Sequence, residues 1–145
     1  MNLKIAKKYS PNFDLKKRKS TNINFLIFHY TGMKNERDAI KRLTSIKSKV
    51  SSHFFINQIG KVYRLVKDDK IAWHAGKSCW GKYKNLNKNS IGIEIVNKGH
   101  KFGYTNFKKK QLSSLIKICQ NLIKKYKIKK QNIVGHSDIA PLRKL

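Results

Sequence analysis

The chain has 145 residues and a mass of 16.9 kDa, which is typical of one domain built around a single core. Its composition, 39% hydrophobic and 10% aromatic, excludes a disordered chain. The formal net charge of +27, from 34 basic and 7 acidic residues, predicts attraction to polyanions such as nucleic acid, anionic membranes or anionic cell-wall polymers. Because lysines are scattered over every segment, a general preference for lysine as a solubilising residue is the simpler explanation of the charge.

Signals for membrane insertion and export are not visible in the sequence. No apolar run approaches the roughly 20 residues needed to span a bilayer, so we expect no transmembrane segment. The basic N-terminus lacks the continuous apolar stretch of a signal peptide, so we expect a cytoplasmic protein, with the cell envelope as the alternative location. Separately, we expect the protein to be a monomer. Cys79 and Cys119 form neither a CxxC zinc pair nor a disulfide framework.

Hydrophobic patterning predicts alternating strands and helices. The predicted elements, in chain order, are a strand at 23–30, a helix at 38–50, an antiparallel strand pair at 52–57 and 61–66, a strand at 90–97, a turn region near Gly99 and Gly103, a helix at 108–127 and a strand at 132–135. Gly60 supplies the positive φ for the turn between the paired strands. The pattern predicts an α/β fold with a mixed central β-sheet flanked by helices. We expect a single domain, 23–145, preceded by an N-terminal extension, 1–22.

Two histidines stand at the ends of predicted strands. His29 and His136 each follow a short apolar strand and precede a turn. Strand ends can meet at one edge of a sheet, so the two imidazoles are candidates to share a metal ion. Either histidine alone would more often be a hydrogen-bonded core residue, and only the pairing favours a metal site.

Glu94 is an acid inside a strongly apolar strand. Alternation along SIGIEIVN places Ile91, Ile93 and Ile95 on one face and Glu94 on the other. Burying an unpaired carboxylate is costly, so Glu94 must be protonated, paired with a cation or facing a wet cleft. The alternative to a catalytic role is a structural ion pair with lysine or arginine.

The segment IAWHAGKSCWG, residues 71–81, gathers aromatic residues, glycines and a histidine in a loop that we expect on the surface. Loops of this content often bind ligands, which makes Trp73, His74 and Trp80 candidate binding residues. The alternative is a loop that docks its tryptophans onto the core. We expect His53 to be structural and His100 to be exposed.

Five segments in order resemble the type-2 N-acetylmuramoyl-L-alanine amidases, a family that includes cell-wall recycling amidases, phage lysozyme-amidases and peptidoglycan recognition proteins. They are FHYTG (28–32), VSSHFFI (50–56), IAWHAG (71–76), NSIGIEIVN (89–97) and NIVGHSDIAPLRK (132–144). The resemblance runs from about residue 23 onward, and GHSDIAP followed by RK is its most specific part. It implies a zinc-dependent hydrolase that cleaves the amide bond between N-acetylmuramic acid and L-alanine in peptidoglycan or muropeptides.

The resemblance also implies roles for single residues. His29 and His136 match the family's zinc ligands. We expect Glu94 to act as general base and Lys144 to stabilise the oxyanion, while the substrate groove is formed by Trp73, His74, Trp80 and Arg143.

The third zinc ligand of the family is usually an aspartate two positions after the lysine that Lys144 matches, which is one residue past Leu145. Asp138 is a poor substitute, because it lies only two residues from His136 in the same motif. A catalytic zinc normally has three protein ligands. We therefore expect a chain that is C-terminally truncated relative to the family and binds Zn2+ weakly.

Two other classes of function compete with this interpretation. A noncatalytic peptidoglycan-binding module is favoured by the missing ligand and disfavoured by the retention of Glu94 and Lys144. A nucleic-acid-binding protein is favoured by the charge, but no helix-turn-helix, zinc-finger or RNA-recognition signature is present. We expect no specific nucleic-acid partner.

Overall fold

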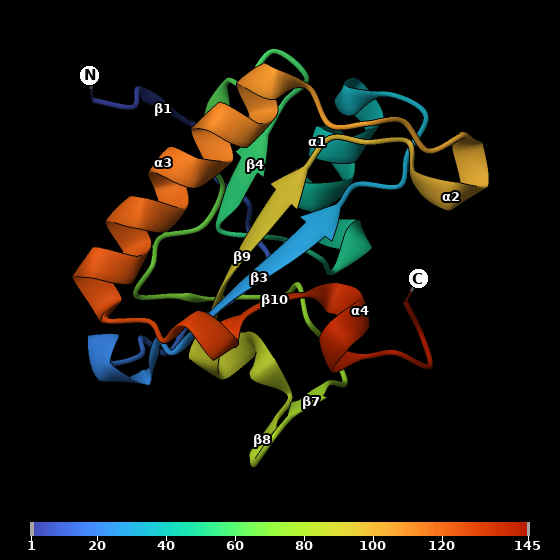
Figure 1. Cartoon of the computed structure of the whole chain (residues 1–145). Coiled ribbons are helices and arrows are strands. Elements are labelled where there is room, and N and C mark those ends of the chain that lie inside the picture. Colours follow the sequence, from blue (N-terminus) through green and yellow to red (C-terminus); the bar gives the residue numbers. More distant parts are fainter. Residues whose placement is uncertain (1, 145) are drawn as a thin grey trace.

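A six-stranded sheet lies at the centre of the computed structural model, which describes residues 2–144 (Figure 1). Its strand order is β1-β5-β4-β9-β3-β10. The strands are β1 (Ile5–Lys7), β3 (Phe25–Tyr30), β4 (Phe54–Ile56), β5 (Val62–Arg64), β9 (Ser90–Ile95) and β10 (Ile133–Gly135). Strand β3 pairs in parallel with β9 and β10, and β4 pairs in parallel with β9 but antiparallel with β5. The predicted mixed central sheet is confirmed.

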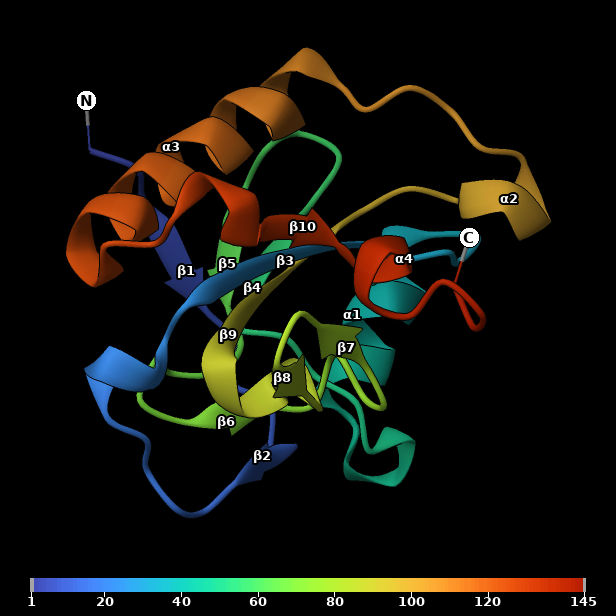
Figure 2. The same ribbon diagram turned by 60° about the horizontal axis from the view of Figure 1, so that its bottom comes forward.

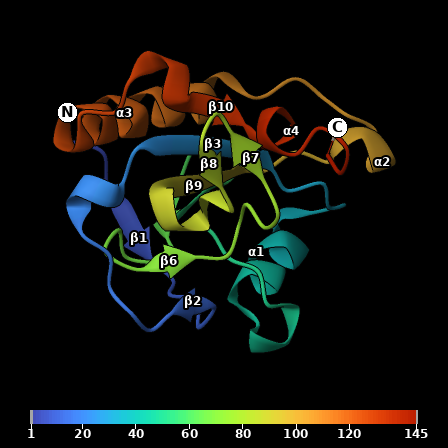
Figure 3. The same cartoon turned by 90° about the horizontal axis from the view of Figure 1, so that it is seen from below.

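Helices cover the sheet on both sides. The long helix α3 (Lys109–Tyr126) packs on one face, and α1 (Glu36–Thr44) lies on the other (Figure 3). The remaining elements are α2 (Gly99–Phe102), α4 (His136–Ile139), the strand pairs β2 (Phe13–Asp14) with β6 (Ile71–Ala72) and β7 (Cys79–Trp80) with β8 (Tyr83–Lys84), and four 3-10 helices, Ser20–Asn22, Ile46–Ser48, Leu86–Asn89 and Lys130–Asn132. No helix of the described residues is long and apolar enough to cross a membrane.

Strand β9 has two chemically different faces. Ile91, Ile93 and Ile95 are buried in an apolar cluster together with Ile118 and Leu122 of α3. Successive side chains of a strand point to opposite faces, so Gly92 and Glu94 face the side where α1 and the loop after β6 lie. The alternation expected from the sequence is therefore observed, and it places an acid opposite an apolar cluster.

Two predicted elements differ from the structure. The helix expected at 38–50 begins earlier, because the Asn35 side chain accepts a hydrogen bond from the Asp38 backbone N–H and caps α1 before Glu36. It also ends earlier, because Ser45 is extended with ψ 129° and a separate 3-10 turn follows. The turn region near Gly99 and Gly103 contains the short helix α2.

Residues 2–22 are part of the folded structure. Strand β1 pairs in parallel with β5 at the sheet edge (Figure 2). Arg18 is buried, and its guanidinium donates to the carbonyl oxygens of Asp68, Asn87 and Lys88. Strands β1 and β2 were not predicted, because strands of three and two residues carry too little alternation to be recognised.

The predicted tight turn between β4 and β5 is confirmed. Gly60 has φ +80°, and a Cβ on it would lie 2.5 Å from the Lys110 carbonyl oxygen of α3. A side chain at this position would be strained by the backbone and would also collide with α3.

Candidate active site

Three parallel strands bring the candidate residues to one edge of the sheet. His29 of β3 and Glu94 of β9 are partners in the parallel register. His136 follows directly after β10, which pairs with the other side of β3. Because the carboxyl ends of neighbouring parallel strands meet at one edge, residues from three distant segments converge there.

His29 and His136 face each other through the same ring atom. Their Nδ1 atoms are 2.9 Å apart. The other nitrogen of His136, Nε2, lies 3.0 Å from the Ala75 carbonyl oxygen. A carbonyl only accepts hydrogen bonds, so in neutral His136 the hydrogen sits on Nε2 and the Nδ1 lone pair points at His29.

Burial keeps both imidazoles neutral. It lowers the pKa of His29 well below its ordinary value, and the nearby His136 and Lys144 lower it further. The pKa of His136 falls to about 4, mainly through burial, although its hydrogen bond to Ala75 opposes the change. Metal ions bind the neutral form of histidine, so both side chains are in the protonation state that a metal requires.

Glu94 lies in the same cavity and has an orphaned oxygen. Its Oε2 atom is fully enclosed and has no hydrogen-bond partner within residues 2–144. Burial raises the pKa of Glu94 to about 8, although the positive charges of Lys144 and Arg42 oppose the rise. A carboxyl group that titrates near neutral pH is suited to accept and return protons.

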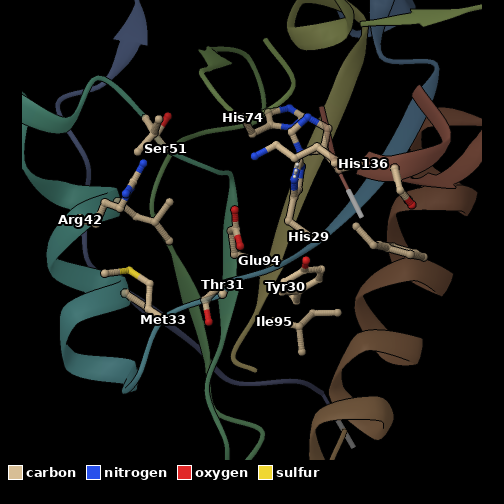
Figure 4. Close-up of a pocket in the computed structure, with 18 of the residues that line it drawn as sticks. His29, Tyr30, Thr31, Met33, Arg42, Ser51, His74, Glu94, Ile95 and His136 are labelled. Atoms are coloured by element: carbon tan, nitrogen blue, oxygen red, sulfur yellow. Dashed lines mark hydrogen bonds between the residues drawn. The ribbon is translucent and has the colours of Figure 1, made fainter. Parts of the chain in front are cut away.

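The cavity extends from the histidine pair across the sheet edge (Figure 4). Its volume is about 600 Å³. The lining includes Trp73 and Lys144, and on the α1 side it includes Arg42. Arg42 was not among the predicted site residues. The sequence does carry a signal for Arg42. It lies three residues after the buried Ala39 and next to the buried Leu43, and this spacing places it at the margin of the inner face of α1.

Trp80 and Arg143 are not among the described residues that line this cavity. Trp80 of β7 packs against the apolar cluster that includes Phe25 and Leu86. Arg143 donates from Nη2 to the carbonyl oxygens of Ala75 and Lys77. The contacts of both residues tie the loop after β6 to the rest of the fold.

His74 departs from the expected surface position. It is buried, with 8% of its surface exposed, so the prediction of an exposed loop is wrong at this residue. The ring lies against the backbone of β9, where a Cβ on Gly92 would come within 2.4 Å of His74 Cγ. Because only glycine leaves this space, the loop can fold its histidine inward. His53 is fully buried and His100 is exposed, as predicted.

The described residues offer part of the donor set that a metal ion requires. If His29 carries its hydrogen on Nε2, its Nδ1 lone pair faces that of His136 at 2.9 Å, and a shared cation would remove the resulting repulsion. Within residues 2–144, no group of three His, Cys, Asp or Glu side chains is arranged to hold a metal. His74 contacts the far nitrogen of His29, and Asp138 accepts a hydrogen bond from the Gly135 backbone N–H at 2.7 Å. The residues present therefore fit two ligands of a zinc site.

Comparison with known proteins identifies the family. The sequence profile described as N-acetylmuramoyl-L-alanine amidase matches residues 19–145. The chain belongs to this family. It is 36% identical over 135 residues to N-acetylmuramoyl-L-alanine amidase AmiD of Escherichia coli strain K12, covering 84% of this chain and 48% of AmiD. It is 30% identical to the 1,6-anhydro-N-acetylmuramyl-L-alanine amidase AmpD of Haemophilus influenzae, covering 94% of this chain and 81% of AmpD.

Solved structures agree with the sequence comparison. The chain superposes with a TM-score of 0.78 on E. coli AmiD in complex with the substrate anhydro-N-acetylmuramic acid-L-Ala-D-gamma-Glu-L-Lys. The two chains are 34% identical, and the match covers 85% of this chain and 51% of AmiD. This chain thus spans about half the length of AmiD, and the single-domain amidase fold expected from the sequence is confirmed.

Proposed function

We propose that the chain is a zinc-dependent N-acetylmuramoyl-L-alanine amidase that hydrolyses the amide bond between N-acetylmuramic acid and L-alanine in peptidoglycan or its muropeptide fragments. The observation that carries the proposal is the combination of two facing Nδ1 atoms, of His29 and His136, with a Glu94 carboxyl oxygen that has no hydrogen-bond partner among residues 2–144, all in one cavity. The relatives AmiD and AmpD are named for this hydrolysis.

His29 and His136 would hold the zinc ion. The chemistry that zinc supplies in such sites is Lewis acidity, which lowers the pKa of a water molecule to about 7 and polarises a carbonyl oxygen. The third family ligand, an aspartate after Lys144, corresponds to a position that follows Leu145 and lies outside the described residues.

Glu94 is the proton carrier in this proposal. In its ionised form it accepts a proton from the attacking water and then donates that proton to the leaving amine of L-alanine. Burial raises the pKa of Glu94 to about 8, and the positive charges of Lys144 and Arg42 limit this rise. A dication held by the histidine pair would lower the pKa of Glu94 further, toward 7. The ionised fraction at neutral pH would increase accordingly.

Lys144 and the cavity walls complete the proposed site. Lys144 lines the cavity and carries a positive charge that can stabilise the negative charge developing on the substrate carbonyl oxygen. Trp73 offers an aromatic wall for the substrate, and Asp14 holds its indole by accepting from Nε1 at 2.7 Å. His29, Glu94 and His136 all come from one sheet edge of one chain, so we take a single chain to be the active unit.

A hydrolysis assay with a matched metal analysis tests the proposal. The 145-residue chain is compared with a version that carries additional C-terminal residues with an aspartate in the family register, each with and without His136→Ala. We expect stoichiometric zinc and release of the stem peptide from a muramoyl peptide only in the extended chain with His136 intact. Mass spectrometry of the products and metal analysis after dialysis give the two readouts.

A noncatalytic peptidoglycan-binding module is the second candidate, because two rather than three zinc ligands are found within residues 2–144. It predicts that the extended chain binds muramoyl peptides and leaves them uncleaved. Full cleavage by the 145-residue chain at the rate of the extended chain would instead show that a residue such as Asp138 completes the site.

A further inference from the structure

A line of buried hydrogen bonds runs from the sheet interior to His29. His74 Nδ1 lies 2.9 Å from His29 Nε2, and His74 Nε2 lies 3.1 Å from Ser90 Oγ. Ser90 in turn donates to the Leu86 carbonyl oxygen at 2.7 Å. His74 and Ser90 are both buried, with exposed fractions of 8% and 0%.

The direction of this line follows from counting hydrogens. A hydroxyl has one hydrogen, and Ser90 gives it to the Leu86 carbonyl, so Ser90 Oγ must accept from His74 Nε2. A neutral imidazole carries one N–H hydrogen, so His74 Nδ1 has no hydrogen and accepts from His29 Nε2. That leaves the lone pair of His29 Nδ1 directed at His136.

Two further contacts hold His74 in place. Asn87 Oδ1 accepts from the backbone N–H groups of His74 and Ala75, at 3.1 and 2.7 Å. The absence of a side chain at Gly92 lets the His74 ring lie directly on β9. The ring is therefore fixed by its backbone, by the strand beneath it and by hydrogen bonds at both nitrogens.

We propose that His74 and Ser90 are positioning residues that hold His29 in the tautomer with its hydrogen on Nε2, so that Nδ1 is free to bind the metal. The inference rests on the zinc site of the proposed function. His74 also lines the cavity, so this role behind the ligand His29 is added to the substrate-binding role expected for it. Partners of this kind orient metal-bound histidines and set their tautomer.

Substitutions at His74 separate the hydrogen bond from the packing. In His74→Asn, Oδ1 takes the place of Nδ1 and can still accept from His29. In His74→Leu, the side chain keeps similar bulk at Cγ and has no acceptor. His100→Leu makes the same change at an exposed histidine and serves as the matched control. Ser90→Ala keeps His74 and removes only the group that fixes its tautomer.

Nitrogen NMR of the metal-free chain reads the tautomers directly through long-range proton–nitrogen correlations of the imidazoles. We expect His29 and His74 to carry their hydrogens on Nε2 in the unsubstituted chain. In His74→Leu and Ser90→Ala, we expect His29 to show a mixture of tautomers. A hydrogen on His29 Nδ1 in the unsubstituted chain would overturn the inference.

Zinc affinity, measured by competition with a chromophoric chelator, is the second readout. In the extended chain, we expect zinc affinity to fall about 10-fold to 100-fold in His74→Leu and about 10-fold in Ser90→Ala. The zinc affinities of His74→Asn and His100→Leu should stay within about threefold of that of the unsubstituted extended chain. Unchanged affinity in both weakened variants would contradict the inference. If neither the 145-residue chain nor the extended chain binds zinc, the proposed function fails, and the NMR spectra still decide the tautomer.

Discussion

The two faces of β9 differ in chemistry although they belong to one strand. On the α3 side, Ile91 and Ile93 are fully buried among other apolar side chains. On the opposite side, Gly92 makes room for His74, and Glu94 has a buried oxygen with no hydrogen-bond partner in the part of the chain that the structure describes. Neighbouring residues of the strand should therefore respond to substitution in different ways, one set through stability and the other through chemistry.

The largest expected effect is on the chemical face. Glu94→Gln should lower amidase turnover of the extended, zinc-loaded chain by about 100-fold or more, because the amide cannot accept the proton of the attacking water. Zinc content and unfolding temperature should change little, because glutamine matches glutamate in shape and Glu94 is not one of the proposed zinc ligands. Near-normal turnover in a pure preparation would exclude Glu94 as the general base.

Ile93→Ala tests the apolar face one residue away. Removing this fully buried side chain should lower the free energy of unfolding by about 2 to 5 kcal/mol, because it opens a cavity against α3. Urea unfolding measures the loss, and zinc affinity under native conditions should stay close to normal. Ile116→Ala, at a 55% exposed position of α3, is the control with little effect on stability. An equal loss in the two variants would contradict this account of the core.

Acid should destabilise the metal-free fold through its buried histidines. Burial and the charge of Arg18 lower the pKa of His53 to about 3, and burial also lowers the pKa of His74. The unfolded chain binds protons near pH 6.5 and the folded chain does not, so stability is fully present above about pH 6.5 and is lost as the pH falls toward 3.

The slope of that loss can be measured. Each such histidine contributes at most about 1.4 kcal/mol per pH unit. Urea unfolding at pH 7, 6 and 5 gives the slope of the free energy of unfolding against pH. In His53→Gln, this slope should be smaller by the contribution of one histidine. A free energy of unfolding that stays constant from pH 7 to 5 would show that these histidines are not held neutral in the fold.

The smallest effect is expected on the solvent side of α3. Lys117 is exposed, and Lys117→Gln should change the free energy of unfolding by less than about 0.5 kcal/mol. Thermal or urea unfolding checks the value. A large change would mean that the lysines of this helix contribute to the fold beyond solubility.

Local patterns predicted the parts of the fold that depend on nearby residues. The spacing of apolar residues predicted α3, which runs from Lys109 to Tyr126, and the alternation in 90–97 predicted the two faces of β9. The meeting of His29 and His136 was expected from their positions at strand ends, and it is observed. Each of these inferences needed only the period of a helix or a strand.

Features that depend on distant residues were not predicted. The inward turn of His74 requires the space at Gly92, and the sequence does not show which residue lies beneath a loop. Arg18 fills its buried site by donating to the carbonyls of Asp68, Asn87 and Lys88, residues far along the chain. Packing between separate segments, rather than propensity within one, decides these positions.

The parallel pairing of β3 with β10 also has a kinetic consequence. The facing nitrogens of His29 and His136 belong to residues 107 positions apart in the sequence. Contacts of such long range form slowly, because the chain must lose the entropy of closing a large loop before the contacts contribute any stability. During synthesis, His29 leaves the ribosome long before its partner, so the pair is completed only when the last strand docks. The capacity to bind metal therefore reports on whether β10 has docked against β3.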